Sequence, residues 1–314
     1  NFVSWTFRKA PKFFDIVTYT GNGSNRAINH NLGGTVGWLV VKRTDGSGNW
    51  FVLDVGTGKR GYFDYTSAAF SSSSGLFFGD GSSYQAPTST QFFISSNGNI
   101  NTNGSEYIAY LFAHNNNDGE FGPDGDQDII KCGSVTSDGS GNATVNLGFE
   151  PQWLMIKTSS STTSGWHIID NMRGVATGVN YQNLLANTNG AEVTAGANYF
   201  EFTSTGFNIN AYPSATNTDW VYMAIRRGPL AAPTDATKVF ALQDPGYPVN
   251  NEGLAFTSGF PVDFALLKER TNSSDGWYSM SRLQGNGNYL QTNSTAAEAS
   301  GVSYGTFDHM TGWY

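Results

Sequence analysis

The feature that most constrains the fold of this chain is an internal repeat with three copies. A run of apolar residues that ends in lysine recurs at intervals of about 110 residues, as Trp38–Lys42, Trp153–Lys157 and Phe264–Lys268. After a polar loop, each copy continues with a second apolar run that begins with tryptophan, at Trp50, Trp166 and Trp277. A period of this length suits one complete small domain per copy, since solenoid repeats are about 20 to 50 residues long.

The repeat predicts three β-sandwich units joined by short linkers. We expect these units at residues 13–114, 129–227 and 238–314, with the third unit incomplete at its C-terminal end. The acidic, glycine-rich stretch 115–128 and the proline- and alanine-rich stretch 228–237 are the predicted linkers.

The N-terminal stretch is expected to belong to a preceding copy of the repeat. Residues 2–8 resemble the closing strands expected at 107–112 and 220–226, so we interpret residues 1–12 as a closing strand and a linker. No initiator methionine, signal peptide or transmembrane run is present in the sequence. A chain cut from a longer array leaves open a signal further upstream.

The composition favours an all-β fold of antiparallel sandwiches, of the jelly-roll or lectin-like kind. Aromatic residues make up 14% of the chain and there are 38 glycines, whereas only 13% of the residues are charged. Such a sequence favours strands joined by tight turns, and no amphipathic helical stretch of useful length is evident. We expect about eight strands per unit, including one at residues 76–78 of the first copy.

The strand that opens each repeat motif is apolar on both faces, which is unusual for a sandwich strand with one solvated face. The second face of this strand must therefore be buried from water by a loop of the same unit, by a neighbouring unit or by another chain. Covering by a loop is the simplest of these. Cover by another chain would make the protein a homo-oligomer, for which we expect a trimer.

The charge of the chain argues against nucleic acid and anionic membranes as partners. The formal net charge is −8, with 17 Lys and Arg residues against 25 Asp and Glu residues. Nucleic-acid grooves draw on clustered cations, which this sequence lacks. The single cysteine, Cys132, excludes an internal disulfide and is expected to be a buried, small apolar residue.

The aromatic residues fall into two classes. Those that recur at equivalent positions are expected to be core residues of each unit: Trp38, Trp50, Trp153, Trp166, Phe264 and Trp277. Tyrosines that do not recur and lie in polar loops are candidates for stacking on a sugar ring, although core packing is the simpler reading. These are Tyr84, Tyr181 and Tyr212.

The acidic linker is the candidate metal site. Five carboxylates fall within eleven residues, at Asp118, Glu120, Asp124, Asp126 and Asp128. Interspersed glycines give the tight backbone that an oxygen cage for Ca²⁺ requires, but the spacing does not meet the EF-hand pattern. A solvated linker without an ion is the alternative interpretation.

No catalytic motif is evident. The four histidines occupy unrelated positions of the repeat, and the chain lacks the metalloprotease, nucleophile-elbow and phosphate-loop motifs. A pair of carboxylates brought together from distant strands, as glycoside hydrolysis needs, stays open at this stage.

Several phrases of the sequence together resemble a known group of proteins. Residues 14–23, 30–33, 38–44 and 129–134 are similar to the repeats of large virion-associated proteins of tailed bacteriophages, especially marine ones. The resemblance covers essentially the whole chain and weakens in the third copy, at residues 239–252. Those proteins are of unknown function or are tail fibre, tailspike or other structural proteins.

The resemblance implies a structural virion protein without carrying over any catalytic residue. We expect a non-enzymatic tail fibre or spike-like appendage that needs no cofactor and presents loops to a host-surface glycan or protein. Its other partners would be further copies of itself and other virion proteins. A polysaccharide-degrading tailspike module and a capsid-decorating protein are the alternatives.

Overall fold

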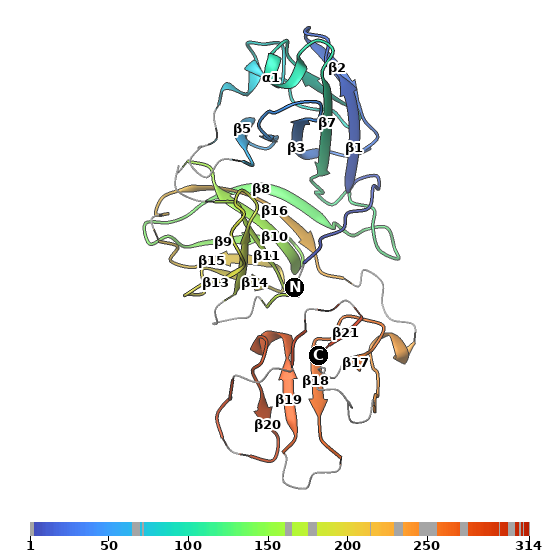
Figure 1. The fold of residues 1–314 in the computed structure, drawn as a ribbon, viewed down its shortest axis with the longest axis vertical. Helices are drawn as coiled ribbons and strands as arrows, with labels where there is room; N and C mark the ends of the chain where they lie inside the picture. Colours follow the sequence, from blue (N-terminus) through green and yellow to red (C-terminus); the bar gives the residue numbers. More distant parts are fainter. Residues whose placement is uncertain are drawn as a thin grey trace.

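The computed structural model consists of three groups of antiparallel strands that follow one another along an elongated molecule (Figure 1). It describes residues 3–64, 70, 72–160, 165–174, 181–213, 215–228, 235–244, 256–270, 276–294, 296–300, 305–307, 309 and 311–313. We call the group β1–β7 the first unit, β8–β16 the second unit and β17–β21 the third unit. Most of the linker predicted at 228–237 lies outside the described residues.

The first unit combines a large and a small sheet. Its elements are β1 (Phe14–Thr20), β2 (Arg26–Asn29), β3 (Val36–Arg43), β4 (Phe51–Asp54), β5 (Lys59–Tyr62), the 3-10 helix η1 (Ser73–Leu76), β6 (Gln91–Ile94), α1 (Gly98–Asn101) and β7 (Glu106–Ala113). The large sheet has the order β1-β7-β3-β4-β5, and β2 pairs with β6. The strand predicted at residues 76–78 is wrong, because this stretch is the end of η1 followed by a turn.

The second unit has the same plan with one more strand in each sheet. Its strands are β8 (Ile130–Thr136), β9 (Ala143–Asn146), β10 (Pro151–Thr158), β11 (His167–Asp170), β12 (Gln182–Leu185), β13 (Val193–Thr194), β14 (Phe200–Thr203), β15 (Gly206–Ile209) and β16 (Asp219–Arg226). The large sheet has the order β13-β12-β11-β10-β16-β8, and the small sheet has the order β14-β15-β9.

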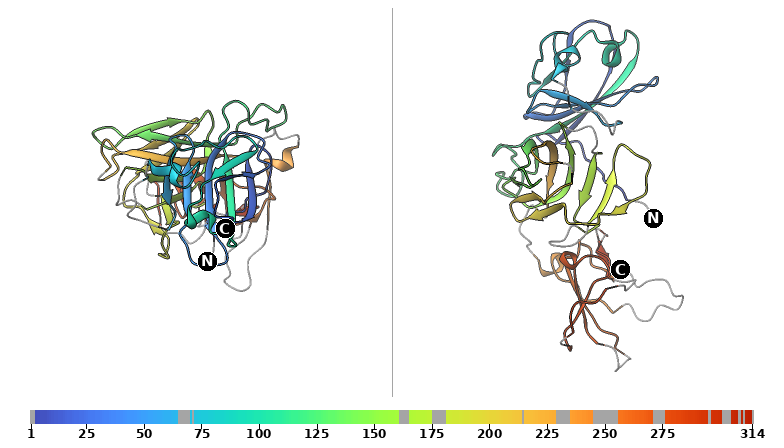
Figure 2. Two further views of the ribbon diagram at one scale, coloured as in Figure 1. Left: turned by 90° about the horizontal axis from the view of Figure 1, so that it is seen from above. Right: turned by 90° about the vertical axis from the view of Figure 1, so that its left-hand side faces the viewer.

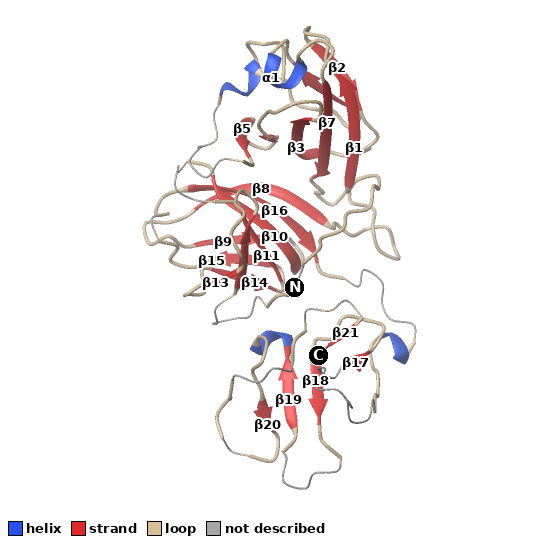
Figure 3. Cartoon of the chain, viewed as in Figure 1, coloured by secondary structure: helices blue, strands red, loops and turns tan. Residues whose placement is uncertain are grey.

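The third unit is smaller in the described part of the chain. It contains η2 (Ala236–Lys238), β17 (Phe256–Thr257), β18 (Phe264–Leu267), β19 (Tyr278–Ser281), η3 (Arg282–Gln284), β20 (Leu290–Gln291) and β21 (Gly312–Trp313). One sheet has the order β18-β19-β20, and the other pairs β17 with β21. Where the structure describes it, the chain is thus almost entirely β, with short helices only (Figure 3).

The repeat motif has the same strand register in all three units. Its first residue pairs with the residue that ends the following strand: Trp38 with Asp54, Trp153 with Asp170, and Phe264 with Ser281. β3 and β10 also share a bulge just before the tryptophan, where the register shifts between Val36 and Trp38 and between Pro151 and Trp153. Because side chains alternate between the faces of a sheet, equal registers place equivalent residues on equivalent faces.

One face of each large sheet, which we call the inner face, packs toward the small sheet of the same unit. In the second unit this core contains Leu154, Ile156 and Ile169 with Phe200 and Phe207 of the small sheet. Trp153, Met155 and Ile168 alternate with these residues and lie on the opposite, outer face. They belong to the apolar cluster of the first unit. The second face of β10 is therefore covered by a neighbouring unit.

Trp166 is the central contact between the first two units. Its side chain is fully buried, and its ring centroid lies 5.4 Å from that of Trp38 and 4.7 Å from that of Phe63. Its indole Nε1 donates a hydrogen bond to the carbonyl oxygen of Tyr62 at 2.7 Å, which satisfies the polar atom inside an apolar contact. The two units share one continuous apolar core as a result.

Backbone atoms also meet in this junction. The amide of Phe70, from the first unit, donates to the carbonyl oxygen of Ser159 in the second at 2.8 Å. Gly37 faces Cys132 so closely that a Cβ atom on Gly37 would lie 2.6 Å from the Cβ of Cys132. Glycine is therefore the residue that fits at position 37, and Cys132 is buried at this contact as the sequence predicts.

Residues 3–9 lie across the same junction without forming a strand. The ring of Phe7 contacts those of Phe112 at 5.8 Å and Trp153 at 5.9 Å, and Trp5 Nε1 donates to Asp170 Oδ2 at 3.0 Å. The predicted closing strand is not formed within residues 3–9, and the assignment of this stretch to a preceding copy stays a prediction. Instead, Phe7 and Trp5 pack between the large sheets of the first and second units.

The second and third units meet through polar groups. Arg282 Nη1 donates to the carbonyl oxygen of Asn171 at 3.3 Å, and Arg227 forms an ion pair with Asp263. The outer face of β18 takes no part in this contact: Phe264 is 57% exposed, Leu266 is 52% exposed and Trp277 is 46% exposed. The prediction that Phe264 and Trp277 are core residues is wrong, because their burial needs a neighbour on the outer face.

Trp166 and Trp50 are buried to different degrees, so we expect their replacement by alanine to lower the free energy of unfolding by different amounts. We expect Trp166→Ala to lower the free energy of unfolding by about 3 to 5 kcal/mol, because it opens a cavity and removes the hydrogen bond to the Tyr62 carbonyl. Trp50→Ala should cost less, since Trp50 is half-buried and stacks on Tyr110. Urea denaturation of both variants measures the two losses, and equal losses would contradict the central place of Trp166.

Candidate functional site

The acidic stretch between the first two units is a structured loop. Phe121 and Gln127 pair with each other through backbone hydrogen bonds of 3.1 and 2.9 Å, which close the loop. The side chain of Asn115 holds its base: Nδ2 donates to the carbonyl oxygen of Lys12 at 2.8 Å, and Oδ1 accepts from the amides of Ile129 and Ile130. The loop is therefore tied to both units at its two ends.

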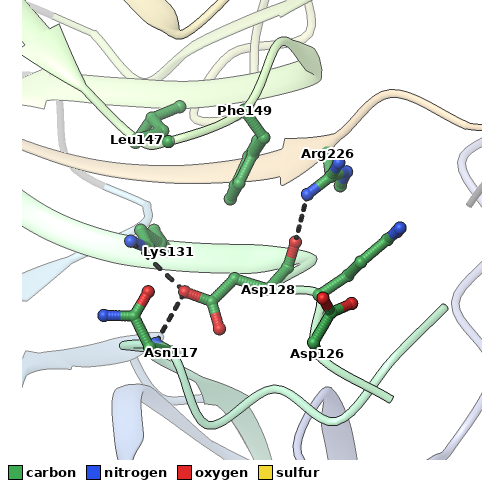
Figure 4. Close-up of a pocket in the computed structure, with 9 residues that line it drawn as sticks. Asn117, Asp126, Asp128, Lys131, Leu147, Phe149 and Arg226 are labelled. Atoms are coloured by element: carbon green, nitrogen blue, oxygen red, sulfur yellow. Dashed lines mark hydrogen bonds and ion pairs between the residues drawn. The ribbon is translucent and has the colours of Figure 1, made fainter. Parts of the chain in front are cut away.

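Asp128 is the organising carboxylate of this loop (Figure 4). It is buried and accepts hydrogen bonds from the backbone amides of Asn117 at 2.9 Å and Gly119 at 3.1 Å. Lys131 Nζ lies 3.3 Å from the same carboxylate. Burial raises the pKa of Asp128, but the two amides and the lysine outweigh it and hold that pKa below its usual value. Asp128 is therefore a carboxylate that already pairs with Lys131 of β8 and with two backbone amides.

The other acidic residues point to different partners. Glu120 forms an ion pair with Lys12 at 2.5 Å, and Asp118 accepts a hydrogen bond from the amide of Asn116 at 2.7 Å. Asp124 and Asp126 are exposed. Across the described residues, no three Asp, Glu, His or Cys side chains come together as a group that could hold a metal ion. Calcium binding by this loop and the solvated linker without an ion stay the two alternatives that a melting experiment must separate.

A polar pocket of about 310 Å³ opens beside this loop. It is lined by Asn117, Asp126, Gln127, Asp128, Lys131, Leu147, Gly148, Phe149 and Arg226. Figure 4 shows Lys131 and Arg226 on either side of Asp128, with Asp126 at the edge. Arg226 Nη1 donates to the carbonyl oxygen of Asp128 at 3.3 Å, and its guanidinium lies 5.7 Å from the ring centre of Phe149.

The chemistry of this pocket suits a polar, uncharged or mixed-charge ligand. Cationic donors from Lys131 and Arg226 stand beside the carboxylate acceptor of Asp126, and Asn117 adds an amide that both donates and accepts. The Oε1 atom of Gln127 is buried and has no hydrogen-bond partner among the described residues. Such a set of donors and acceptors can hydrogen-bond the hydroxyl groups of a ligand, whereas the anionic groups in the lining disfavour a phosphate.

The three tyrosines proposed as sugar platforms do not present free ring faces together. Tyr181 is 1% exposed and packs on Phe200, so its assignment as a stacking residue is wrong. Tyr84 is half-buried against Gly58, and burial raises its pKa to about 12. Tyr212 is half-buried, and its hydroxyl lies 3.0 Å from His167 Nε2. Tyr181 and Tyr212 therefore both pack on Phe200 in the core of the second unit, whereas Tyr84 lies in the first unit.

Sequence reasoning missed a buried polar cluster in the core of the second unit. His167 contacts Asn183 through Nδ1 at 3.0 Å and Tyr212 through Nε2 at 3.0 Å. Lys157 is fully buried nearby, and burial lowers its pKa to about 8. A signal was available, because His167 occupies the position of Phe51 and Tyr278 in the other copies. The pocket described above does not include any of these residues, so we interpret the cluster as structural.

His167 predicts an acid-sensitive second unit. Burial lowers its pKa in the folded chain to about 4, against about 6.5 in the unfolded chain. The unfolded state therefore binds more protons between these values, and the free energy of unfolding should fall as the pH drops from about 6.5 to 4. Replacing His167 by Phe, the residue of the first copy, should flatten this dependence in pH-dependent urea titrations. An unchanged profile would show that other groups cause it.

Melting curves test the calcium prediction. A bound ion would raise the melting temperature by mass action. Since Asp128 and Glu120 are already paired with cations or amides, we expect curves recorded with calcium and with chelator to coincide. A reproducible rise with calcium that is lost in Asp126→Asn would instead establish an ion site at the exposed acids.

The described part of the chain contains no helix long and apolar enough to cross a membrane. No curated protein and no solved structure matched the chain in the comparisons with known proteins. Residues 8–229 match a family model described as a domain of unknown function, DUF7483. Since this match spans the first and second units and more than half of the sequence, the chain belongs to the DUF7483 family.

Proposed function

We propose that this protein is a non-enzymatic structural component of a phage virion, a tail fibre or spike-like appendage that binds a host-surface glycan or protein. The resemblance of its repeats to tailed-phage virion proteins motivates the phage context. The observation that carries the structural role is the shared core of the first two units, centred on Trp166. An appendage that transmits load needs such fixed joints between its modules.

The architecture that we propose is a tandem array of antiparallel β-sandwich units of about 110 residues each, a usual domain size. The first two large sheets share one strand order, in which the last strand of the unit lies between its first and third. The pairings of Trp38 with Asp54, Trp153 with Asp170 and Phe264 with Ser281 support extending the array to the third unit.

We propose the polar pocket at the acidic loop as the ligand site of this appendage. It lies where the loop 115–128 meets the second unit, and Lys131 and Arg226 project into it from adjacent strands, β8 and β16. Donors carried on strands are held more firmly than donors on loops, which favours a defined ligand orientation. Several copies of the chain in one appendage would raise the overall avidity of a weak site.

The remaining partners follow from the same role. We propose that the chain contacts other virion proteins and associates with further copies of itself, and that its mature location is the virion. The threefold order expected from phage appendages stays a prediction. The first two units cover each other's outer faces, so self-association through such a face is left to the third unit.

Binding without degradation is the expected behaviour toward a host-surface polysaccharide. The purified chain should be retained by the polysaccharide, and the polysaccharide should keep its length after incubation. Lys131→Ala with Arg226→Ala should weaken binding at least about tenfold, since charged hydrogen-bonding groups contribute about 1.5 to 3 kcal/mol each. Lys59→Ala, in the first unit away from the pocket, is the matched control.

Two results would overturn this assignment. Release of shortened oligosaccharides would establish the alternative, a polysaccharide-degrading tailspike module. Equal binding by the double variant and the control would move the ligand site away from the pocket while leaving the appendage role open.

A further inference from the structure

The outer face of the third unit carries an exposed apolar patch at the place where the first two units are buried. The patch, which we call the β18 face, consists of Phe264, Leu266, Trp277 and Leu290. Phe264 and Leu266 alternate along β18 with Ala265 and Leu267, which face the core of the third unit. Soluble monomers seldom expose adjacent large apolar side chains in this way, so the patch indicates an interaction surface.

The equivalent residues of the second unit show what kind of surface covers such a face. By register, Phe264, Leu266 and Trp277 correspond to Trp153, Met155 and Trp166. Those three are 5%, 9% and 0% exposed, because the outer face of the first unit lies against them. The contact joins two outer faces: Trp38 meets Trp166, and Phe7 bridges Phe112 to Trp153.

Within the residues that the structure describes, the first two units leave no free outer face for the third unit. The outer faces of the first and second units are already buried against each other. The second unit reaches the third through Arg282, Asn171, Arg227 and Asp263, which lie beside the β18 face and leave it open. Figures 1 and 2 show the third unit at the far end of the molecule from the first.

We propose that the β18 face binds the β18 face of a second copy of this chain, which pairs two molecules about a twofold axis. This inference rests on the self-association part of the proposed function and assigns this face a twofold pair in place of the threefold order. A face that meets its own copy forms a closed, isologous contact, in which each residue appears twice. Phe264 and Trp277 supply the aromatic anchors that dominate such contacts, and Leu266 lies between them in the register.

Light scattering coupled to size exclusion tests the pairing on the intact chain. We expect a concentration-dependent shift from monomer to dimer. Leu266→Asp should raise the dissociation constant about 30-fold or more, since a charge would be buried at the centre of the contact. Val193→Asp is the matched control, because Val193 is exposed to a similar degree, 54%, in the second unit. Circular dichroism checks that both variants are folded.

A cysteine at the face gives a second readout that does not depend on affinity. Ser279 lies on the same face of β19 as Trp277, and Cys132, the single native cysteine, is buried. Ser279→Cys should form disulfide-linked dimers under mild oxidation, whereas Val193→Cys should not. If the chain is a monomer at all concentrations and Ser279→Cys forms no disulfide-linked dimer, the proposed pairing is wrong. The proposal of host-surface binding does not depend on this result. A trimer whose mass is unchanged by Leu266→Asp also overturns it, and supports threefold assembly elsewhere.

Discussion

The contact of Trp166 with Trp38 and Tyr62 is the interaction on which the arrangement of this molecule depends. It brings together the outer faces of two large sheets, which would otherwise expose rows of apolar side chains to water. Its single indole hydrogen bond ends on a backbone carbonyl of the other unit, so the contact fixes orientation as well as burying area. Phe7, Phe70 and Gly37 then fill the space around it. Because the two units share a core in this way, we expect them to unfold as one body.

The residues matched by the family model agree with the observation that the first two units share one core. The match runs from residue 8 to residue 229 and contains both units with the acidic loop between them. Asp128 and Asn115 tie that loop to the backbone on both sides, which explains why a stretch with five acidic residues is ordered. Electrostatic repulsion within the loop is offset by Lys12 and Lys131, each supplied by a neighbouring element. The pocket depends on the order of this loop, because its walls come from the loop and the second unit.

The sequence predicted the sheets better than it predicted burial. Alternation and turns are local properties, so the strands at Trp38, Trp153 and Phe264 and their common register could be derived from the repeat. Whether an outer face is buried depends on the next unit, and that information is absent from the motif itself. Trp166 and Trp277 occupy equivalent positions, yet one is fully buried and the other is about half exposed. The His167 cluster was not predicted for a similar reason. In the sequence, Lys157 resembles an exposed residue at the end of a strand, and its burial depends on elements that are distant in the sequence.

The central claim is that the first two units form one cooperative body, and native-state hydrogen exchange on the full chain tests it most directly. The slowest amides of β3 and β10 should open with the same free energy, and Trp166→Ala should lower both by the same amount. Amides of β19 should keep their wild-type values in that variant. If Trp166→Ala weakens protection in β10 and leaves β3 unchanged, the two units unfold independently and the shared core does not join them.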